Sequence, residues 1–300
     1  MTPTPGTAAE STLAVDSAAP GAAVDAASPG AGARRHRKGT LALGWERAKV
    51  DLRELVRNSQ SVGWTLAFPL LMLVLFATIF HGRVQGTDVT YSQLFVAGII
   101  GSAAMATGFV NTAIAIALDR DAGKLKRLAG TPMPKAAFFI GRGVAVLVMT
   151  IAEVVVLLGF GVAFYHVHLP TQPSRWLTFA WVLVLGLGAS TLLGIAVGGR
   201  IGNAKAAPAV VNLPYVALQF ISGVYVPFTQ LSPTLKTVSA FFPLRWLCQG
   251  MRSVFLPDSF QANEVGHTWQ HPTMALVLGA WVVGASLLCL LTFRWVRDDG

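Results

Sequence analysis

The chain has 300 residues, which would ordinarily make about two soluble domains, but its composition is that of a membrane protein. Hydrophobic residues make up 53% of it and charged residues only 12%, whereas soluble chains are about 25% charged. The net charge of +9 does not indicate nucleic-acid binding, because the basic residues lie between apolar runs too long for a soluble core. Cys248 and Cys289 lie in or beside such runs, which excludes a secreted disulfide-rich domain.

The N-terminal part of the sequence predicts two different segments. Residues 1–40 are mainly Ala, Pro, Gly, Ser and Thr, a composition that predicts a disordered cytoplasmic tail, and we interpret the basic run at 34–38 as a contact with anionic membrane lipid. Residues 41–58 have helical periodicity, which predicts a helix lying along the membrane interface. Its apolar stripe consists of Leu41, Trp45, Ala48, Leu52, Leu55 and Val56. A polar extension of the first membrane span is the alternative.

Six apolar windows follow. A helix needs about 20 apolar residues to cross roughly 30 Å of hydrocarbon, and the windows at 62–80, 92–118, 143–165, 176–198, 206–226 and 273–293 meet this requirement. They lack the apolar and polar alternation of a β-barrel wall. The sequence therefore predicts an all-α polytopic membrane protein, with six transmembrane helices in one domain over residues 41–297.

The basic residues predict the orientation of these spans, because Lys and Arg are retained on the cytoplasmic side during insertion. With both termini inside, 18 of the 23 Lys and Arg residues fall in cytoplasmic segments. The five on the outer side are Arg83, Arg175, Lys236, Arg245 and Arg252. We therefore expect both termini to be cytoplasmic.

The connection between the second and third spans, residues 119–135, has the pattern of a short cytosolic helix. Acidic residues open it and basic residues follow, as the helix dipole favours, and Gly130 with Thr131-Pro132 supplies a stop. Leu125 and Leu128 share one face, and we expect both to be exposed on so short a helix. Exposed apolar side chains within charged surroundings indicate a docking site for a soluble partner. A basic topogenic loop is the alternative.

The segment 223–272 lies on the predicted outer side and yet is apolar. Its prolines can occupy the first turns of short helices, and apolar helices too short to span the bilayer favour re-entry into the outer leaflet, over about residues 227–256. The residues that mark this region are Gly223, Pro227, Pro233, Pro243, Arg245 and Arg252. An ordinary extracellular loop is the alternative.

This order of features resembles the ABC-2 family of membrane permeases, the transmembrane subunits of ATP-driven exporters. The resemblance covers roughly residues 41–297 and rests on the interfacial helix, the 222–252 region and the loop pattern, whose marked residues are Asp119, Asp121, Gly123, Leu125, Leu128, Thr131 and Pro132. The family usually has Glu at the two Asp positions and often near Lys126, so this helix is more basic. The sequence Lys-Arg-Leu-x-Gly-Thr-Pro looks most like the multidrug and antibiotic-efflux branch.

The resemblance implies that 119–132 is the coupling helix, which fits a groove of a separate ATPase subunit. ATP and Mg²⁺ would be bound by that subunit, because no G-x-x-x-x-G-K-[ST] motif occurs here, and no cofactor is expected on this chain. The implied assembly is two permeases, identical or closely related, with two ATPases in the cytoplasmic membrane of a prokaryote. It would export a hydrophobic or amphipathic drug, antibiotic, lipid or glycan, and the chain itself would not be an enzyme.

Two features within the spans suggest specific roles. Glu153 is the one acidic residue in the six windows, and a carboxylate at membrane depth is read first as functional, here as part of a transport pathway. A protonated, purely structural carboxyl is the alternative. In the fourth span, small residues recur every four positions and predict a helix-packing ridge. They are Gly186, Ser190, Gly194 and Gly198.

Other functional classes have weaker support. The pairs His166 and His168, and His267 and His271, have spacings that can bind a metal, but no Cys accompanies them, so we expect solvated histidines and no metal site. H-E-x-x-H and G-x-S-x-G motifs are absent, which argues against an intramembrane enzyme. A channel or a secondary transporter that needs no ATPase is the main alternative.

Overall fold

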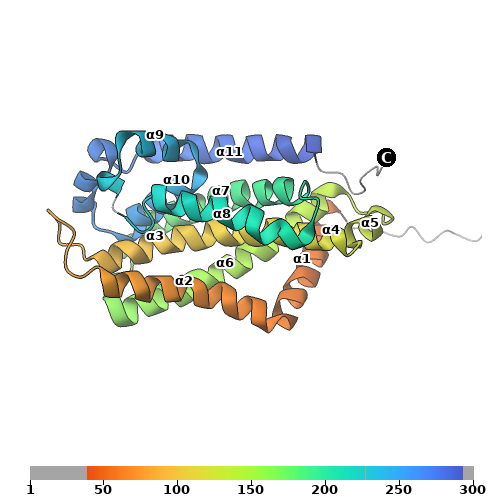
Figure 1. Ribbon diagram of the computed structural model, residues 1–300, viewed down its shortest axis with the longest axis horizontal. Coiled ribbons are helices and arrows are strands. Elements are labelled where there is room, and N and C mark those ends of the chain that lie inside the picture. Colours follow the sequence, from red (N-terminus) through yellow and green to blue (C-terminus); the bar gives the residue numbers. More distant parts are fainter. Residues whose placement is uncertain (1–38, 227, 293–300) are drawn as a thin grey trace, which may run out of the picture. The chain divides into compact units, whose positions relative to one another are not determined.

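The computed structural model describes residues 39–226 and 228–292, which form helices and loops with no β-strand among them. Its α-helices are α1 (Thr40–Arg57), α2 (Ser59–Ile79), α3 (Tyr91–Met105), α4 (Thr112–Asp121), α5 (Lys124–Ala129), α6 (Lys135–Tyr165), α7 (Pro173–Gly198), α8 (Ala207–Ile221), α9 (Pro233–Phe241), α10 (Pro243–Phe255) and α11 (His271–Thr292). A π-helix, η1 (Ala106–Asn111), joins α3 to α4. Four short 3-10 helices are η2 (Ala204–Ala206), η3 (Phe228–Gln230), η4 (Asp258–Asn263) and η5 (Val265–His267). Figure 1 shows that the axes of the long helices are roughly aligned with one another.

Five of the described helices are long and apolar enough to cross a membrane. They are Ser59–Ile79, Tyr91–Asp121, Lys135–Tyr165, Pro173–Gly198 and His271–Leu291, and each coincides with one of the predicted windows. The second of them is continuous through α3, η1 and α4. An all-α, multi-pass membrane fold is therefore confirmed.

The predicted span at 206–226 is shorter than the sequence indicates. Its helix, α8, has 15 residues, a length of about 22 Å, which is less than the hydrocarbon thickness of about 30 Å. The helix ends at Ile221 because Gly223 adopts a positive φ of 75°, which a right-handed helix does not allow. The apolar window is continuous in composition, but the backbone turns within it.

The predicted interfacial helix is a separate element, α1, and not an extension of α2. Asn58 separates the two helices, and its side chain accepts a hydrogen bond from the Ser61 backbone N–H at the start of α2. Figure 1 shows α1 crossing the ends of the long helices. Its predicted apolar stripe is divided: Ala48 is buried, whereas Trp45 and Val56 are exposed.

The helix α1 lies very close to α6 because both contribute glycine to the contact. A Cβ atom added to Gly141 would be 2.6 Å from the Cγ atom of Arg47 and 2.9 Å from the carbonyl oxygen of Gly44. No side chain fits in that space. The α1 helix is therefore held against the start of α6 at backbone distance.

The largest apolar core surrounds α10, which lies among α3, α7 and α11. All 13 residues of α10 are buried, although only Phe242 separates this helix from α9. At Gly101 of α3, an added Cβ would be 2.9 Å from the Cα atom of Cys248, so the two backbones are in direct contact. Trp281 of α11 donates a hydrogen bond to the carbonyl oxygen of Phe241 at 2.7 Å, which fixes the end of α9.

Four of the predicted features lie partly or wholly outside the described residues. The predicted tail is described only at Gly39 and Thr40, and Thr40 already belongs to α1. The basic run at 34–38 is outside the described part, as are Pro227 and the C-terminal residues 293–300.

Candidate functional site

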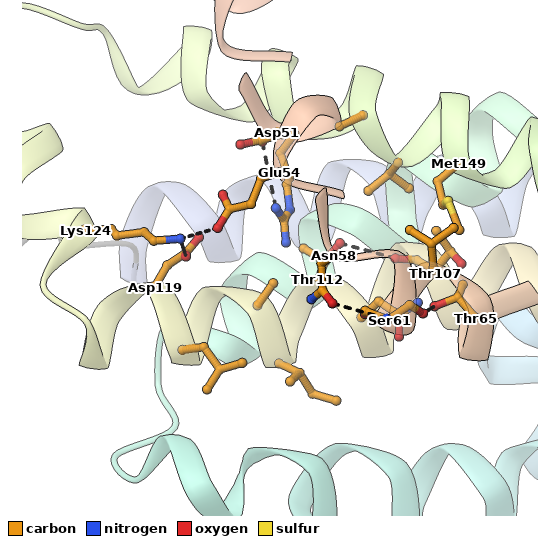
Figure 2. Close-up of a pocket in the computed structure, with 18 of the residues that line it drawn as sticks. Asp51, Glu54, Asn58, Ser61, Thr65, Thr107, Thr112, Asp119, Lys124 and Met149 are labelled. Carbon is orange, nitrogen blue, oxygen red and sulfur yellow. Dashed lines mark hydrogen bonds and ion pairs between the residues drawn. The ribbon is translucent and has the colours of Figure 1, made fainter. Parts of the chain in front are cut away.

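A cavity of about 620 Å³ lies between α1, α2, the α3–η1–α4 helix and α6. Charged side chains line one end of it, and hydroxyl and amide side chains line the other (Figure 2). The polar lining consists of Asn58, Ser61, Thr65, Thr107, Asn111 and Thr112. Apolar side chains, among them Val62, Val146 and Met149, complete the wall. A ligand in this cavity would contact both apolar surface and polar groups, which is typical of small-molecule sites.

At the charged end, Lys124 joins three elements. Its Nζ atom donates a hydrogen bond to the Glu54 carboxylate of α1 and lies 3.0 Å from Oδ1 of Asp119 in α4, as Figure 2 shows. The hydrogen bond from Lys124 lowers the pKa of Glu54, and the same bond raises the pKa of Lys124. Both shifts favour the charged forms of Glu54 and Lys124, and the two ion pairs connect α1 and the end of α4 to α5.

Next to these residues, Asp51 forms a second link between α1 and α6. Its Oδ1 atom is 2.8 Å from Nη2 of Arg47, and its Oδ2 atom is 3.8 Å from Nη1 of Arg142. Burial raises the pKa of Asp51, although both arginines act in the opposite direction. Asp51 is only 3% exposed. Asp51 could not be predicted as a linking residue, because the periodicity of residues 41–58 assigns it to neither the apolar nor the charged face.

At the deep end, the cavity reaches Thr107 of η1, which contacts Glu153 of α6. The Thr107 hydroxyl is 2.8 Å from each carboxylate oxygen of Glu153 and donates to that carboxylate. Glu153 is 2% exposed and lies behind Thr107, not in the cavity wall. Thr107 lies in the π-helical turn, and such turns are frequent at functional sites. Sequence reasoning identified Glu153 but not Thr107 or the π-helix.

The predicted exposure of Leu125 is wrong. Leu125 is 1% exposed and packs in a small core with Ile116, Phe138, Ile195 and Cys289. Gly123 has a φ of 70° and turns the chain between α4 and α5, which directs Leu125 back onto the membrane helices. Leu128 is half-buried against the same core. These two leucines therefore stabilise the fold of the chain itself, and an external partner cannot reach Leu125.

The other predicted coupling residues lie around this short helix. Asp119 and Asp121 are in the last turn of α4, so the predicted single helix 119–132 is in fact the end of α4, a turn and α5. Thr131 and Pro132 are exposed after α5 ends at Ala129. The exposed side chains of this loop are thus mostly polar or basic.

At the opposite end of the molecule, the predicted short helices are present as α9 and α10. Pro233 and Pro243 each occupy the first turn of a helix, as the sequence predicts. Arg245 is buried, with its guanidinium 4.4 Å from the ring centre of Phe228 and 4.6 Å from that of Trp246. These cation–π contacts place a charged group within apolar surroundings.

Arg252 forms a buried ion pair that the sequence did not reveal. Its Nε atom is 2.5 Å from Oε1 of Glu264, and its Nη2 atom is 3.2 Å from Oε2. A third donor, Nη1, reaches the carbonyl oxygen of Gly223 at 3.3 Å. Arg252 thus ties α10 to the end of α8 and to the loop before α11, and it is 2% exposed.

The small residues of α7 lie against neighbouring helices. Gly186 faces Leu247 of α10, and Ser190 faces Gly108 of η1. At Gly194, an added Cβ would be 2.7 Å from the carbonyl oxygen of Phe109. At Gly198 the approach is closer still, because an added Cβ would be 2.4 Å from the carbonyl oxygen of Ala113 in α4. One side of α7 therefore accommodates the whole η1–α4 segment.

A further buried polar group joins α3 to α8. The hydroxyls of Ser102 and Tyr215 are 2.8 Å apart, and the Gln219 side-chain amide donates to Ser102 Oγ at 2.6 Å. Each residue is at most 5% exposed. This network anchors the short helix α8, and sequence reasoning missed it because each residue is unremarkable in its own window.

Comparisons with known proteins agree with this architecture. The family model for the ABC-2 type transporter matches residues 47–256, a range that includes every residue lining the cavity. The chain is 24% identical over 203 residues to the ycf38 protein of Porphyra purpurea, named as a transport permease, which covers 65% of this chain and 68% of that protein. It is 20% identical over 197 residues to YvfS of Bacillus subtilis (strain 168), also named as a transport permease, with coverage of 64% and 77%. The chain therefore belongs to the ABC-2 type transporter family and is a multi-pass transport permease.

Proposed function

We propose that this chain is the permease subunit of an ATP-driven exporter, with ATP and Mg²⁺ bound by a separate ATPase subunit. The observation that carries the proposal is the family match over residues 47–256, because members of this family generally work with an ATPase partner. The assembly would contain two permeases, identical or closely related, and two ATPases. It would lie in the cytoplasmic membrane of a prokaryote with both termini inside, as the distribution of basic residues supports.

The α4–α5 connection is the proposed coupling element. Because Leu125 is buried, its contact with the ATPase would be made by exposed neighbours such as Lys126, Arg127 and Thr131. The Lys124 ion pairs with Glu54 and Asp119 support this role, since they give α5 a direct connection to α1 and to the end of α4. Movement of α5 would therefore be transmitted to two walls of the cavity.

The cavity between α1, α2, α3–η1–α4 and α6 is the proposed entry site for substrate. Its combination of apolar wall and polar lining supports a hydrophobic or amphipathic substrate. Glu153 would act at the deep end of this cavity, through its hydrogen bond with Thr107. Because α8 alone is too short to cross the hydrocarbon, it would make the sixth crossing together with the turn that follows it. The helices α9 and α10 would re-enter the outer leaflet, which the proline at the start of each helix and the complete burial of α10 support.

Co-purification from the native host followed by transport measurements tests the proposal. A tagged chain is expected to co-purify with a Walker-motif ATPase identified by mass spectrometry, and the reconstituted pair is expected to move an amphipathic dye only with hydrolysable ATP. A variant ATPase in which the Walker lysine is replaced is the matched control. Transport by the permease alone, without any ATPase, would reject the proposal in favour of a channel or a secondary transporter.

A further inference from the structure

A second groove, of about 710 Å³, lies between α1 and α5 and is strongly basic. Its lining contains five cationic side chains and one carboxylate: Arg47, Arg53, Arg57, Lys124, Arg127 and Glu54. Lys124 and Glu54 also line the substrate cavity, so the groove adjoins that cavity without being part of it. Such an accumulation of one charge in a concave surface attracts an acidic partner.

Three of these cations are not neutralised within the part of the chain that the structure describes. Arg47 is paired with Asp51, and Lys124 is paired with Glu54 and Asp119. Arg53 and Arg57 have no carboxylate partner among the described residues, and Arg127 reaches only the carbonyl oxygen of Ala122, at 3.5 Å. Arg53 and Arg57 are also four residues apart on one helix, where like charges are destabilising. A bound carboxylate would remove this repulsion.

The direction in which the groove opens distinguishes a protein partner from membrane lipid. The exposed apolar side chains Leu41, Trp45 and Val56 of α1, which are 53–77% exposed, form a stripe on one side of the helix that is suited to the membrane interface. A single exposed apolar residue of α1, Val50, lies among the groove-lining residues instead. Successive residues of an α-helix are about 100° apart, so the groove-lining residues of α1 are centred about 150° away from this apolar stripe. The basic groove therefore faces away from the lipid-facing side of α1.

We propose that this groove binds an acidic surface of the ATPase subunit, an inference that rests on the proposed function. Arginine suits this task because its planar guanidinium binds a carboxylate through two parallel hydrogen bonds. The partner surface would present at least two carboxylates, one for Arg53 and Arg57 and one for Arg127. The permease would thus be recognised through charge on both α1 and α5, instead of through the leucines of α5.

Binding of the co-purifying ATPase to the purified permease, in nanodiscs of purely zwitterionic lipid, tests this proposal. The double variant Arg53→Glu/Arg57→Glu is expected to bind the ATPase at least about tenfold more weakly at low salt, and the difference is expected to shrink at high salt, where charges are screened within a few Å. Arg53→Lys/Arg57→Lys keeps both charges and is expected to bind nearly as well as wild type. Arg127→Glu tests the α5 side of the groove independently.

The matched control is Arg200→Glu/Lys205→Glu, which changes the charge equally at exposed positions of the α7–α8 connection, outside the groove. Unchanged ATPase binding by both the α1 double variant and Arg127→Glu would overturn the proposal while leaving the proposed function intact. The proposal would also be overturned if the groove variants bound the ATPase normally in zwitterionic nanodiscs and showed a defect only in nanodiscs that contain anionic lipid. That result would assign the groove to lipid phosphate. If the wild-type chain binds no ATPase, the proposed function itself fails, and the charge variants are not needed to reach that result.

Discussion

The hydroxyl of Thr107, in the π-helical turn, donates a hydrogen bond to the carboxylate of Glu153 on α6, with 2.8 Å between Thr107 Oγ1 and each carboxylate oxygen. Thr107 lines the cavity between α1, α2, α3–η1–α4 and α6, and Glu153 does not. The carboxylate is therefore connected to the cavity through a single side chain, and this contact joins two helices that are 46 residues apart in the sequence.

Removing this contact is expected to impair transport more than folding. Thr107→Val keeps the shape of the side chain but removes its hydrogen bond with Glu153, and a buried polar group left without a partner costs about 1–3 kcal/mol. Thr107→Ser retains the donor and is the control. ATP-dependent dye export in reconstituted vesicles measures the effect, together with Glu153→Gln. Wild-type export and an unchanged pH profile in Glu153→Gln would show that the carboxyl is structural.

The contribution of the Lys124 ion pairs to coupling is expected to be constant throughout the neutral pH range. The folded-state pKa of Glu54 is lowered, so its contribution is present above the ordinary carboxyl value of 4.5 and is lost only as the pH falls through the lowered value. The pKa of Lys124 is raised, so its contribution is complete below 10.5 and is lost only as the pH rises through the raised value.

Lys124→Gln is therefore expected to reduce export by the same factor at every value between about pH 6 and pH 9. Its midpoint of thermal unfolding is expected to change little, because exposed ion pairs contribute only about 0.2–1 kcal/mol. A ratio of variant to wild-type export that varies within this pH range would contradict the assignment. The measurement is dye export in vesicles at matched internal and external pH.

Leu125→Ala is expected to destabilise the permease. The side chain is 1% exposed in a closed apolar core, and a Leu to Ala replacement in such a core costs about 2–5 kcal/mol. Thermal unfolding in detergent measures the loss. Lys126→Ala, on the exposed side of the same helix, is the control and is expected to unfold at the wild-type temperature. An unchanged midpoint for Leu125→Ala would show that α5 is detached from the membrane helices.

The Arg252 and Glu264 pair is expected to behave as a unit. Arg252→Met leaves a buried carboxylate without its partner, which typically costs about 3–5 kcal/mol. The double variant Arg252→Met/Glu264→Leu removes both charges and is expected to recover most of that loss, apart from the hydrogen bond to Gly223. Thermal unfolding of the three proteins tests this expectation. A double variant as unstable as the single one would mean that packing, and not charge, dominates at this position.

The orientation in the membrane is tested with single cysteines and an impermeant maleimide. Cysteines at Arg83, Thr171 and Ala262, all exposed, are expected to react from outside intact cells. Cysteines at Gly130 and Asn203 are expected to react only after permeabilisation, because the basic residues cluster on their side. The native Cys248 and Cys289 are buried and are expected to give little background. External labelling at Gly130 would reject the proposed orientation.

Composition and periodicity were sufficient to predict the main architecture. Membrane helices must satisfy their backbone hydrogen bonds internally, so apolar length alone located five spans, and the proline positions located the starts of α9 and α10. Glu153 was identifiable because a carboxylate is rare at membrane depth. These signals are local, and each is contained in a single window of sequence.

The contacts between windows could not be predicted. Leu125 was assigned to the exposed side because its helix is short and charged, yet the turn at Gly123 places it against residues from α4, α6, α7 and α11. Thr107 is one of many hydroxyl residues in apolar windows, and only the π-helical turn distinguishes it. The partner of Arg252 lies 12 residues away in a polar loop, where a glutamate would ordinarily be solvated.

The complete burial of α10 has a mechanical consequence. Because α10 touches α3 through backbone at Gly101 and Cys248 and also packs on α7 and α11, it cannot slide past any of them without breaking close contacts, since packed interiors resist compression. The ends of α3, α7 and α11 that pack around α10 therefore form one rigid block with it. By contrast, only 11% of the apolar window of α2 is buried within the chain. If the helices separate at this end of the molecule, we expect them to separate at the edge of the block, between α2 and α3, and not between α10 and the helices around it.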